Sequence, residues 1–185
     1  MAAAIFALPA PVQAASKMVL DAKITEAVET FYEISRAGEI LAEKAAGMLV
    51  FPKIAKVGLA VGGEYGEGAL LVDGKVVDYY RSAAASVGLQ FGAQVRTQII
   101  LFMEEEALQS FRNSSGWEVG VDGSVAIASL GAAGEIDSET AKQPVVGFVI
   151  ANKGLMYNLT LEGTKISKLD KDKKRKGLGL RKKRV

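Results

Sequence analysis

Residues 56–76 read KVGLAVGGEYGEGALLVDGKV, and this stretch decides the fold class. Val57, Leu59 and Val61 alternate with small residues, which is the period of a half-buried β-strand. Further along, Asp73-Gly74 separates two apolar strand patterns. Asp and Gly tolerate the positive φ angles of a type I′ turn, so this pair predicts a two-residue hairpin. The stretch therefore predicts antiparallel β-structure.

The Gly-rich run at residues 62–68 does not have the pattern of a phosphate-binding loop. A Walker loop needs Gly-Lys-Ser/Thr at the start of a helix, whereas this run contains Glu64 and Glu67 and continues into strand pattern. We interpret the glycines as a strand bend or a β-bulge. The two carboxylates leave a weaker alternative open, a hydrolase or an oxygen-ligand metal site built on Glu64 and Glu67.

Other strand patterns follow this stretch. Alternating apolar residues predict strands over residues 86–96, 117–122 and 155–162, with Val95 and Val121 on the buried side. Two runs are apolar throughout and predict strands covered on both faces, at residues 99–103 and 145–150. Short spacing between the turns indicates mostly antiparallel strands in a curved sheet or small barrel.

Two helices are predicted. Apolar residues recur every three or four positions over residues 20–46, which predicts an amphipathic N-terminal helix that stops at Gly47. Its polar face has a net negative charge, so we expect it to pack on the sheet rather than on a membrane. Residues 104–112 predict a short inserted helix with Ala107, Leu108 and Phe111 facing inward. The predicted class is α+β, with an N-terminal amphipathic helix packed on the curved, mostly antiparallel sheet.

Composition restricts the chemistry. The 185 residues include no Cys and no His. This excludes disulfide scaffolds, thiolate or imidazole metal sites, and Ser-His-Asp or Cys-His catalysis. We therefore expect a binding or structural protein that is not an enzyme and that carries no cofactor or metal.

Charge is segregated along the chain. Residues 1–163 contain 12 Lys/Arg against 19 Asp/Glu, a net charge of −7, whereas residues 164–185 contain 11 Lys/Arg against 2 Asp/Glu, a net charge of +9. We predict a single domain over residues 16–167 and a basic, disordered tail over residues 168–185. Such a tail is typical of proteins with a polyanionic partner.

The N-terminal segment resembles part of a secretory signal. Residues 2–8 form a short apolar run, and Val12-Gln13-Ala14 places modest or small residues where signal peptidase cuts. We interpret residues 1–15 as a signal remnant and expect a periplasmic or secreted protein that can associate with a membrane.

Basic side chains are the candidate binding residues. Each Lys or Arg near an anionic bilayer contributes about 1 kcal/mol of attraction. The candidates for lipid binding are Lys53, Lys56, Lys171, Lys173, Lys174, Arg175, Lys176, Arg181, Lys182, Lys183 and Arg184. The tail contains no aromatic residues for base stacking, so specific nucleic-acid binding is not expected.

Five blocks of sequence resemble the SYLF domain family in its bacterial secreted or envelope form. They lie at residues 45–54, 56–70, 85–94, 116–126 and 152–166. The resemblance implies binding to acidic phospholipids, including phosphoinositides in eukaryotic members, some of which also associate with actin. The basic tail lies beyond these blocks.

The sequence thus favours non-enzymatic, peripheral binding of anionic phospholipid membranes by an exported SYLF-like domain, aided by the polybasic tail. The alternative is a structural or scaffolding protein of the envelope that binds an anionic polymer or a protein partner.

Overall fold

A computed structural model of the chain describes residues 12–58, 61–87, 94–128, 136–151, 154–155 and 161–170. Several predictions fall outside these residues. They are most of the signal remnant, the basic tail from Lys171 onward, and the parts of two predicted strands at residues 88–93 and 156–160.

The N-terminal helical region consists of two helices, α1 (Val12–Ile34) and α2 (Arg36–Lys44). They are separated at Ser35, whose hydroxyl oxygen accepts a hydrogen bond from the backbone N–H of Gly38 at 2.9 Å. A Ser in this position caps α2, because its side chain satisfies an N–H group that the helix leaves free. The prediction of one helix over residues 20–46 was therefore wrong in three respects: the helical region begins earlier, at Val12, a cap interrupts it, and Gly47 is the first residue of a strand.

In the described part of the chain, nine strands form one sheet. Four long strands come first: β1 (Gly47–Gly58), β2 (Val61–Val72), β3 (Lys75–Val87) and β4 (Gln94–Phe102). Short elements follow, namely α3 (Glu105–Asn113), β5 (Trp117–Glu118), β6 (Ala126–Ile127), α4 (Ser138–Ala141), β7 (Val145–Ala151), β8 (Gly154–Leu155) and β9 (Lys165–Lys168).

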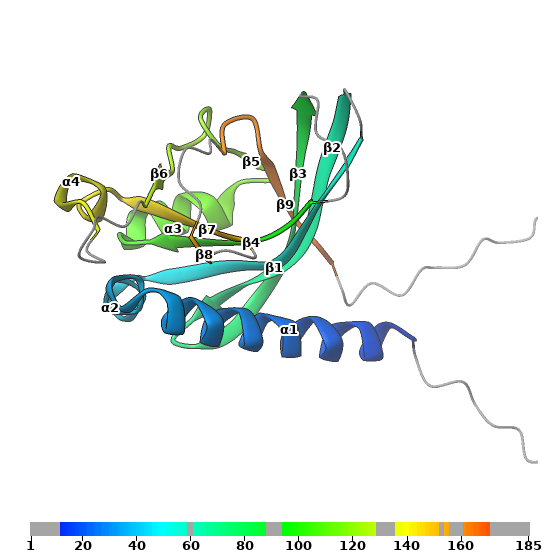
Figure 1. Cartoon of the computed structure of the whole chain (residues 1–185), viewed down its shortest axis with the longest axis horizontal. Coiled ribbons are helices and arrows are strands. Elements are labelled where there is room, and N and C mark those ends of the chain that lie inside the picture. The colour runs from blue at the N-terminus through cyan, green and yellow to red at the C-terminus, as the bar shows by residue number, and fades with distance from the viewer. Residues whose placement is uncertain are drawn as a thin grey trace, which may run out of the picture.

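The strand order is β5-β9-β3-β2-β1-β4-β7-β6, with β8 beside β7. Among the described strands, only the pair β6–β7 is parallel. The sheet curls, with α1 lying across its convex side and α3 on its concave side (Figure 1). The predicted α+β class, with a helix on a curved, mostly antiparallel sheet and one inserted short helix, is confirmed.

The predicted hairpin joins β2 to β3. Asp73 and Gly74 both have positive φ angles, 50° and 71°. Two consecutive residues in this conformation match the right-handed twist of the flanking strands, as a type I′ turn requires.

The sheet is covered on both faces. On the convex face, α1 buries Leu20, Ile24, Ala27 and Phe31, and the ring of Phe31 meets that of Phe148 edge-on at 4.7 Å between centroids. On the concave face, Leu108 and Phe111 of α3 pack with Trp117 in a second core. The continuous apolar runs of β4 and β7 are therefore explained, since their alternate residues enter the two cores.

Two strand predictions were wrong in detail. The strand that begins at Trp117 ends at Glu118, because a tight turn follows in which the Asp122 carboxylate accepts the Glu118 N–H at 2.7 Å. Val121 is consequently 74 % exposed. Val95 is also exposed, because it lies on the convex face beyond the edge of α1, while the neighbouring Arg96 lies on the concave face.

Candidate functional site

Strand β1 contains a bulge at Phe51-Pro52. Val50 pairs with Ala69 of β2 but Lys53 pairs with Glu67, so β1 has one residue more than its partner between these points. A central strand tolerates a proline only where no ladder hydrogen bond needs its N–H, and a bulge is such a place. The Pro52 carbonyl oxygen still accepts a hydrogen bond, from the Thr97 hydroxyl of β4 at 3.0 Å.

The Gly-rich run of β2 packs closely against β1 at this bulge. A Cβ atom on Gly68 would lie 2.1 Å from the Val50 carbonyl oxygen and 2.7 Å from the Phe51 ring. Only glycine allows β1 to come this close. The interpretation of the glycines as part of a bulge or bend is confirmed at this position.

The bulge changes which residues face each side of the sheet. Phe51 and Ile54 both belong to the concave core although they are three residues apart. Lys53 therefore lies on the convex face, beside α1, whereas Lys56 lies on the concave face with Ile54.

Two grooves open on the convex face where the second half of β1 diverges from α1. The first has a volume of about 320 Å³ and is bounded by α1, β1, β4 and β7. The second has a volume of about 310 Å³ and lies between the start of α1 and strands β1 and β2. Both grooves share Lys23, Pro52 and Lys53 in their walls, so these three residues form the ridge between them.

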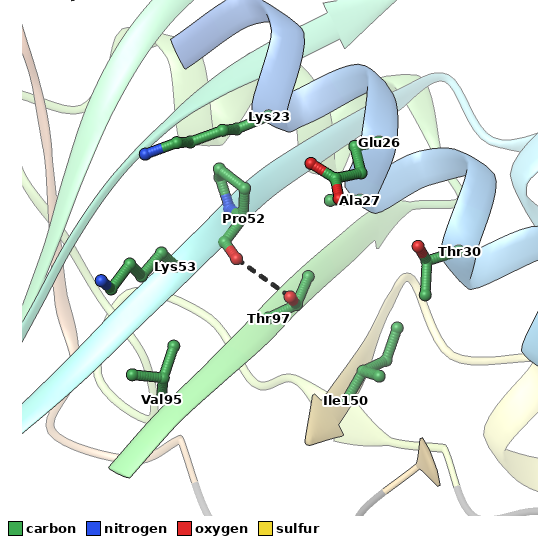
Figure 2. A pocket seen from close by; sticks show the side chains of 9 residues that line it. All are labelled: Lys23, Glu26, Ala27, Thr30, Pro52, Lys53, Val95, Thr97 and Ile150. Atoms are coloured by element: carbon green, nitrogen blue, oxygen red, sulfur yellow. Dashed lines mark hydrogen bonds between the residues drawn. The ribbon is translucent and has the colours of Figure 1, made fainter. Parts of the chain in front are cut away.

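Lys23 and Lys53 are the cations of this site. Figure 2 shows both side chains extending to the same side of Pro52, one from α1 and one from β1. Glu26 lies on the other side of Pro52, in the first groove (Figure 2). Both lysines line the second groove, which Glu26 does not, and the wall of that groove also includes Glu67, the cross-strand partner of Lys53.

Apolar side chains surround the two lysines. Val19 and Tyr65 line the second groove, Val95 lines the first, and Met18 lies next to Val19 on α1. These are four of the nine large apolar side chains that are exposed among the described residues. Such a group around a polar site is typical of a surface that binds a partner or a membrane.

Tyr65 contributes a polar group as well. Its hydroxyl donates a hydrogen bond to Glu67 at 3.1 Å, along the wall of the second groove. Burial, together with this hydrogen bond to the Glu67 carboxylate, raises the pKa of Tyr65 above its ordinary value. Tyr65 therefore stays a neutral hydrogen-bond donor throughout the physiological range.

The sequence prediction located one of these cations and missed the other. Lys53 lies in both grooves, but Lys56 is on the opposite face of the sheet. Lys23 was not a candidate, because its position on a helix with net negative charge gives no indication that it meets Lys53. The predicted tail residues Lys171, Lys173, Lys174, Arg175, Lys176, Arg181, Lys182, Lys183 and Arg184 lie outside the described residues.

The carboxylates Glu64 and Glu67 do not form a pair. Glu64 binds Arg96 on the concave face, whereas Glu67 accepts from Tyr65 on the convex face. The sheet separates them, so the two cannot act on one substrate. Within the described residues, no group of three or more acidic side chains is placed to hold a metal ion, and no helix has the length and apolar character to cross a bilayer.

One comparison with known proteins identifies a family. The family model described as Ysc84, Las17-binding protein actin regulator, matches residues 83–176, which is half of the chain. The match begins in β3 and runs into the basic segment that follows Asp170. It includes Val95 and Thr97 of the first groove, but Lys23 and Lys53 precede it. No curated protein matches the chain significantly.

Proposed function

The chain belongs to the Ysc84, or SYLF, domain family, as its resemblance predicts, and we propose that it binds anionic phospholipid surfaces without catalysing a reaction. The observation that carries this proposal is that Lys23 and Lys53 both line two adjoining grooves, which are bordered by exposed apolar side chains. A phosphate group of a lipid would lie between the two ammonium groups.

The neighbouring apolar residues give the site a second kind of contact. Val19 lines the second groove together with Lys23, and Met18, the residue before it on α1, is exposed. Side chains of this type reach into the boundary between headgroups and acyl chains when a helix lies on a membrane. The surface therefore combines charge attraction with a modest apolar contact, which is the combination expected of a peripheral membrane protein.

The basic tail strengthens this attraction. Its nine predicted binding residues lie between residues 171 and 184, after Asp170, which is the last described residue. At about 1 kcal/mol for each Lys or Arg held near an anionic surface, the tail supplies long-range attraction and the grooves supply position. Because exposed charges are screened, binding should weaken steeply as salt is added.

Export is part of the proposal. The support is the sequence of residues 1–15, which has the apolar run and the small residues of a signal cleavage region. A periplasmic or secreted protein would meet phosphatidylglycerol and related acidic lipids. Sequencing the mature N-terminus and fractionating the cells tests this part, and an uncleaved cytosolic protein would contradict it.

The test of the lipid site is charge reversal. Lys23→Glu with Lys53→Glu should weaken binding to vesicles of phosphatidylcholine and phosphatidylglycerol by at least about 30-fold. Lys75→Glu with Lys142→Glu is the matched control, since these exposed lysines lie outside both grooves and the net charge change is the same. Equal weakening in the two double variants would mean that the grooves are not the site. A wild-type protein that does not bind these vesicles at low salt would contradict the proposal as a whole.

A second candidate function comes from the family description, which names a protein, Las17, as the bound partner and actin regulation as the role. On this alternative the chain is an envelope scaffold whose grooves or tail bind a protein or an anionic polymer. Cross-linking in cells followed by mass spectrometry tests it. A partner held at high salt, together with no preference for anionic vesicles, would favour the scaffold.

A further inference from the structure

The second groove contains a carboxylate beside its two lysines. Glu67 lines this groove together with Lys23 and Lys53. In the register of the sheet, Glu67 lies between Lys53 of β1 and Arg81 of β3, each directly opposite it on a neighbouring strand. Directly opposite residues project from the same face of a sheet, so all three belong to the convex face. A single carboxylate is therefore set among the cations of this surface.

The Glu67 carboxylate is held against Tyr65. The Tyr65 hydroxyl donates a hydrogen bond to Glu67 Oε1 at 3.1 Å. Glu67 is half-buried, whereas Tyr65 is 48 % exposed and lines the same groove. A carboxylate can accept several hydrogen bonds at once, and a hydroxyl that donates one bond can still accept another. The two side chains thus place neighbouring hydrogen-bond acceptors on the groove wall, within reach of a group that donates.

The groove has space for a small polar group. Its volume of about 310 Å³ is at the lower end of the range for ligand sites. The charged residues in its wall are two lysines and one glutamate, which leaves a net charge of +1. A phosphodiester carries a single negative charge, so a ligand that joins only neutral groups to its phosphodiester balances the charge of the wall.

Other common headgroups match this wall less well. Phosphatidic acid ends at its phosphate, which is a monoester with more negative charge near neutral pH, and it brings no further group to Glu67. The serine headgroup carries a carboxylate next to its ammonium group, so contact with Glu67 would bring two negative charges together. An ethanolamine ammonium would lie among Lys23, Lys53 and Arg81. A hydroxyl group avoids all three conflicts, because it is neutral and donates to a carboxylate.

We propose that the second groove selects phospholipids whose headgroup carries hydroxyl groups next to the phosphodiester, as the glycerol headgroup of phosphatidylglycerol does. The phosphodiester lies between the ammonium groups of Lys23 and Lys53, and the headgroup hydroxyls donate to Glu67 and to the Tyr65 oxygen. The occupant is a lipid, since the exposed Val19 in the same groove offers an apolar contact to the acyl-chain boundary. This inference rests on the function proposed above and adds Glu67 and Tyr65 as specificity-determining residues.

Three kinds of vesicle separate headgroup chemistry from charge. Each contains phosphatidylcholine and the same mole fraction of phosphatidylglycerol, phosphatidylserine or phosphatidic acid, with identical acyl chains. Charge alone predicts equal binding to the first two and binding at least as tight to the third. We expect the wild-type protein to bind phosphatidylglycerol vesicles at least about five-fold more tightly than either of the others, which is the effect of one hydrogen bond.

Glu67→Gln is the decisive variant, because it keeps the size of the side chain and removes its charge. It should bind phosphatidylserine more tightly than the wild type does, and the preference for phosphatidylglycerol over phosphatidylserine should disappear. Glu29→Gln is the matched control, since it makes the same change of charge at an exposed position of α1 outside both grooves. It should keep the wild-type preference. Tyr65→Phe should reduce the preference as well, and it provides the test if Glu67→Gln does not fold.

This inference and the proposed function fail in different ways. A wild-type protein that binds the three kinds of vesicle equally, or phosphatidic acid most tightly, would overturn headgroup selection and leave anionic-lipid binding in place. An unchanged preference in folded Glu67→Gln or Tyr65→Phe would do the same. A wild-type protein that binds none of the vesicles would contradict the proposed function itself.

A free headgroup tests whether the occupant is a lipid. Glycerophosphoglycerol has the phosphodiester and the hydroxyl groups but no acyl chains. We expect it to displace the protein from phosphatidylglycerol vesicles only in the millimolar range, because it lacks the apolar contact and the attraction of a charged surface. Displacement at micromolar concentration would mean that the groove binds a soluble ligand, and it would overturn the assignment to a lipid.

Discussion

Lys53 and Lys56 are three residues apart in β1 and lie on opposite faces of the sheet. Lys53 forms part of the ridge between two open grooves, whereas Lys56 lies opposite Glu64 on the face that also carries Ile54. The two lysines therefore cannot contact one flat surface together, and a membrane bound at the grooves would meet only Lys53.

This separation predicts different effects for two similar substitutions. Lys53→Ala should weaken binding to phosphatidylglycerol vesicles about five-fold, since one lysine near an anionic surface contributes about 1 kcal/mol. Lys56→Ala should change the affinity less than about two-fold. Vesicle co-sedimentation at low salt measures both. A larger loss with Lys56→Ala, in protein whose circular dichroism is unchanged, would place the membrane on the concave face.

The attachment of α1 to the sheet can be tested at Tyr79. Its hydroxyl donates to the Asp21 carboxylate at 2.6 Å, and Lys17 lies over its ring. Tyr79→Phe removes the hydrogen bond and keeps the ring, so it should lower the free energy of unfolding by about 1–2 kcal/mol. Urea denaturation measures this. Tyr65→Phe, which removes an exposed hydrogen bond to Glu67, should change stability by less than about 0.5 kcal/mol, and equal losses would contradict the assigned anchor.

Alkaline pH should destabilise the protein through Tyr80. Burial, with a smaller contribution from the Asp78 carboxylate, raises the pKa of Tyr80 to about 12. Above pH ~10 the phenol of the unfolded chain loses its proton, while the phenol of the folded protein keeps it. The free energy of unfolding therefore keeps its full value below pH ~10 and falls by up to about 3 kcal/mol between pH ~10 and ~12. Urea denaturation at several pH values should show this loss in the wild type and a smaller loss in Tyr80→Phe.

At neutral pH the same variant should be more stable than the wild type. The Tyr80 hydroxyl is buried and has no hydrogen-bond partner in the described part of the chain, so its removal leaves no group unsatisfied. We expect a gain of about 1 kcal/mol. A loss of stability at pH 7 would mean that the hydroxyl is bound to an ordered water.

Because of the bulge in β1, we expect alanine substitutions to be tolerated at some glycines of the Gly-rich run and not at others. Gly68→Ala would place a Cβ atom 2.1 Å from the Val50 carbonyl oxygen, and the backbone must move to accept it. We expect a loss of at least about 3 kcal/mol or failure to fold. Gly63→Ala is the control, because its nearest contact would be 3.7 Å, and its stability should stay within about 1 kcal/mol of the wild type. Equal tolerance at the two positions would contradict the close approach of β1 and β2.

Local features of the fold could be predicted from the sequence. The hairpin at Asp73-Gly74 and the helix at Glu105–Asn113 depend on residues that are neighbours in the chain. The apolar runs of β4 and β7 also indicate burial on both faces, and both strands were found. In these cases turn chemistry, the helix dipole and the hydrophobic period act within a few residues.

The site could not be predicted in the same way. The meeting of Lys23 with Lys53 depends on how α1 crosses the sheet and on where β1 bulges, and neither appears in the local pattern. The break at Ser35 was missed because the hydrophobic period continues through it. Val121 was predicted to lie in a strand because apolar and polar residues alternate through residues 117–122. The side chain of Asp122 closes a turn there, however, and ends the strand pairing.

The extra residue at Phe51-Pro52 also shifts the phase of β1. In an unbroken strand, Lys53 would follow Leu49 and Phe51 onto the concave face, and Ile54 would point outward beneath α1. Deleting one residue at the bulge would restore regular pairing and leave every later side chain of β1 on its present face. A one-residue insertion or deletion elsewhere in β1 would instead move Lys53 toward the concave core and Ile54 onto the convex face, and it should be far more harmful than loss of the bulge residue.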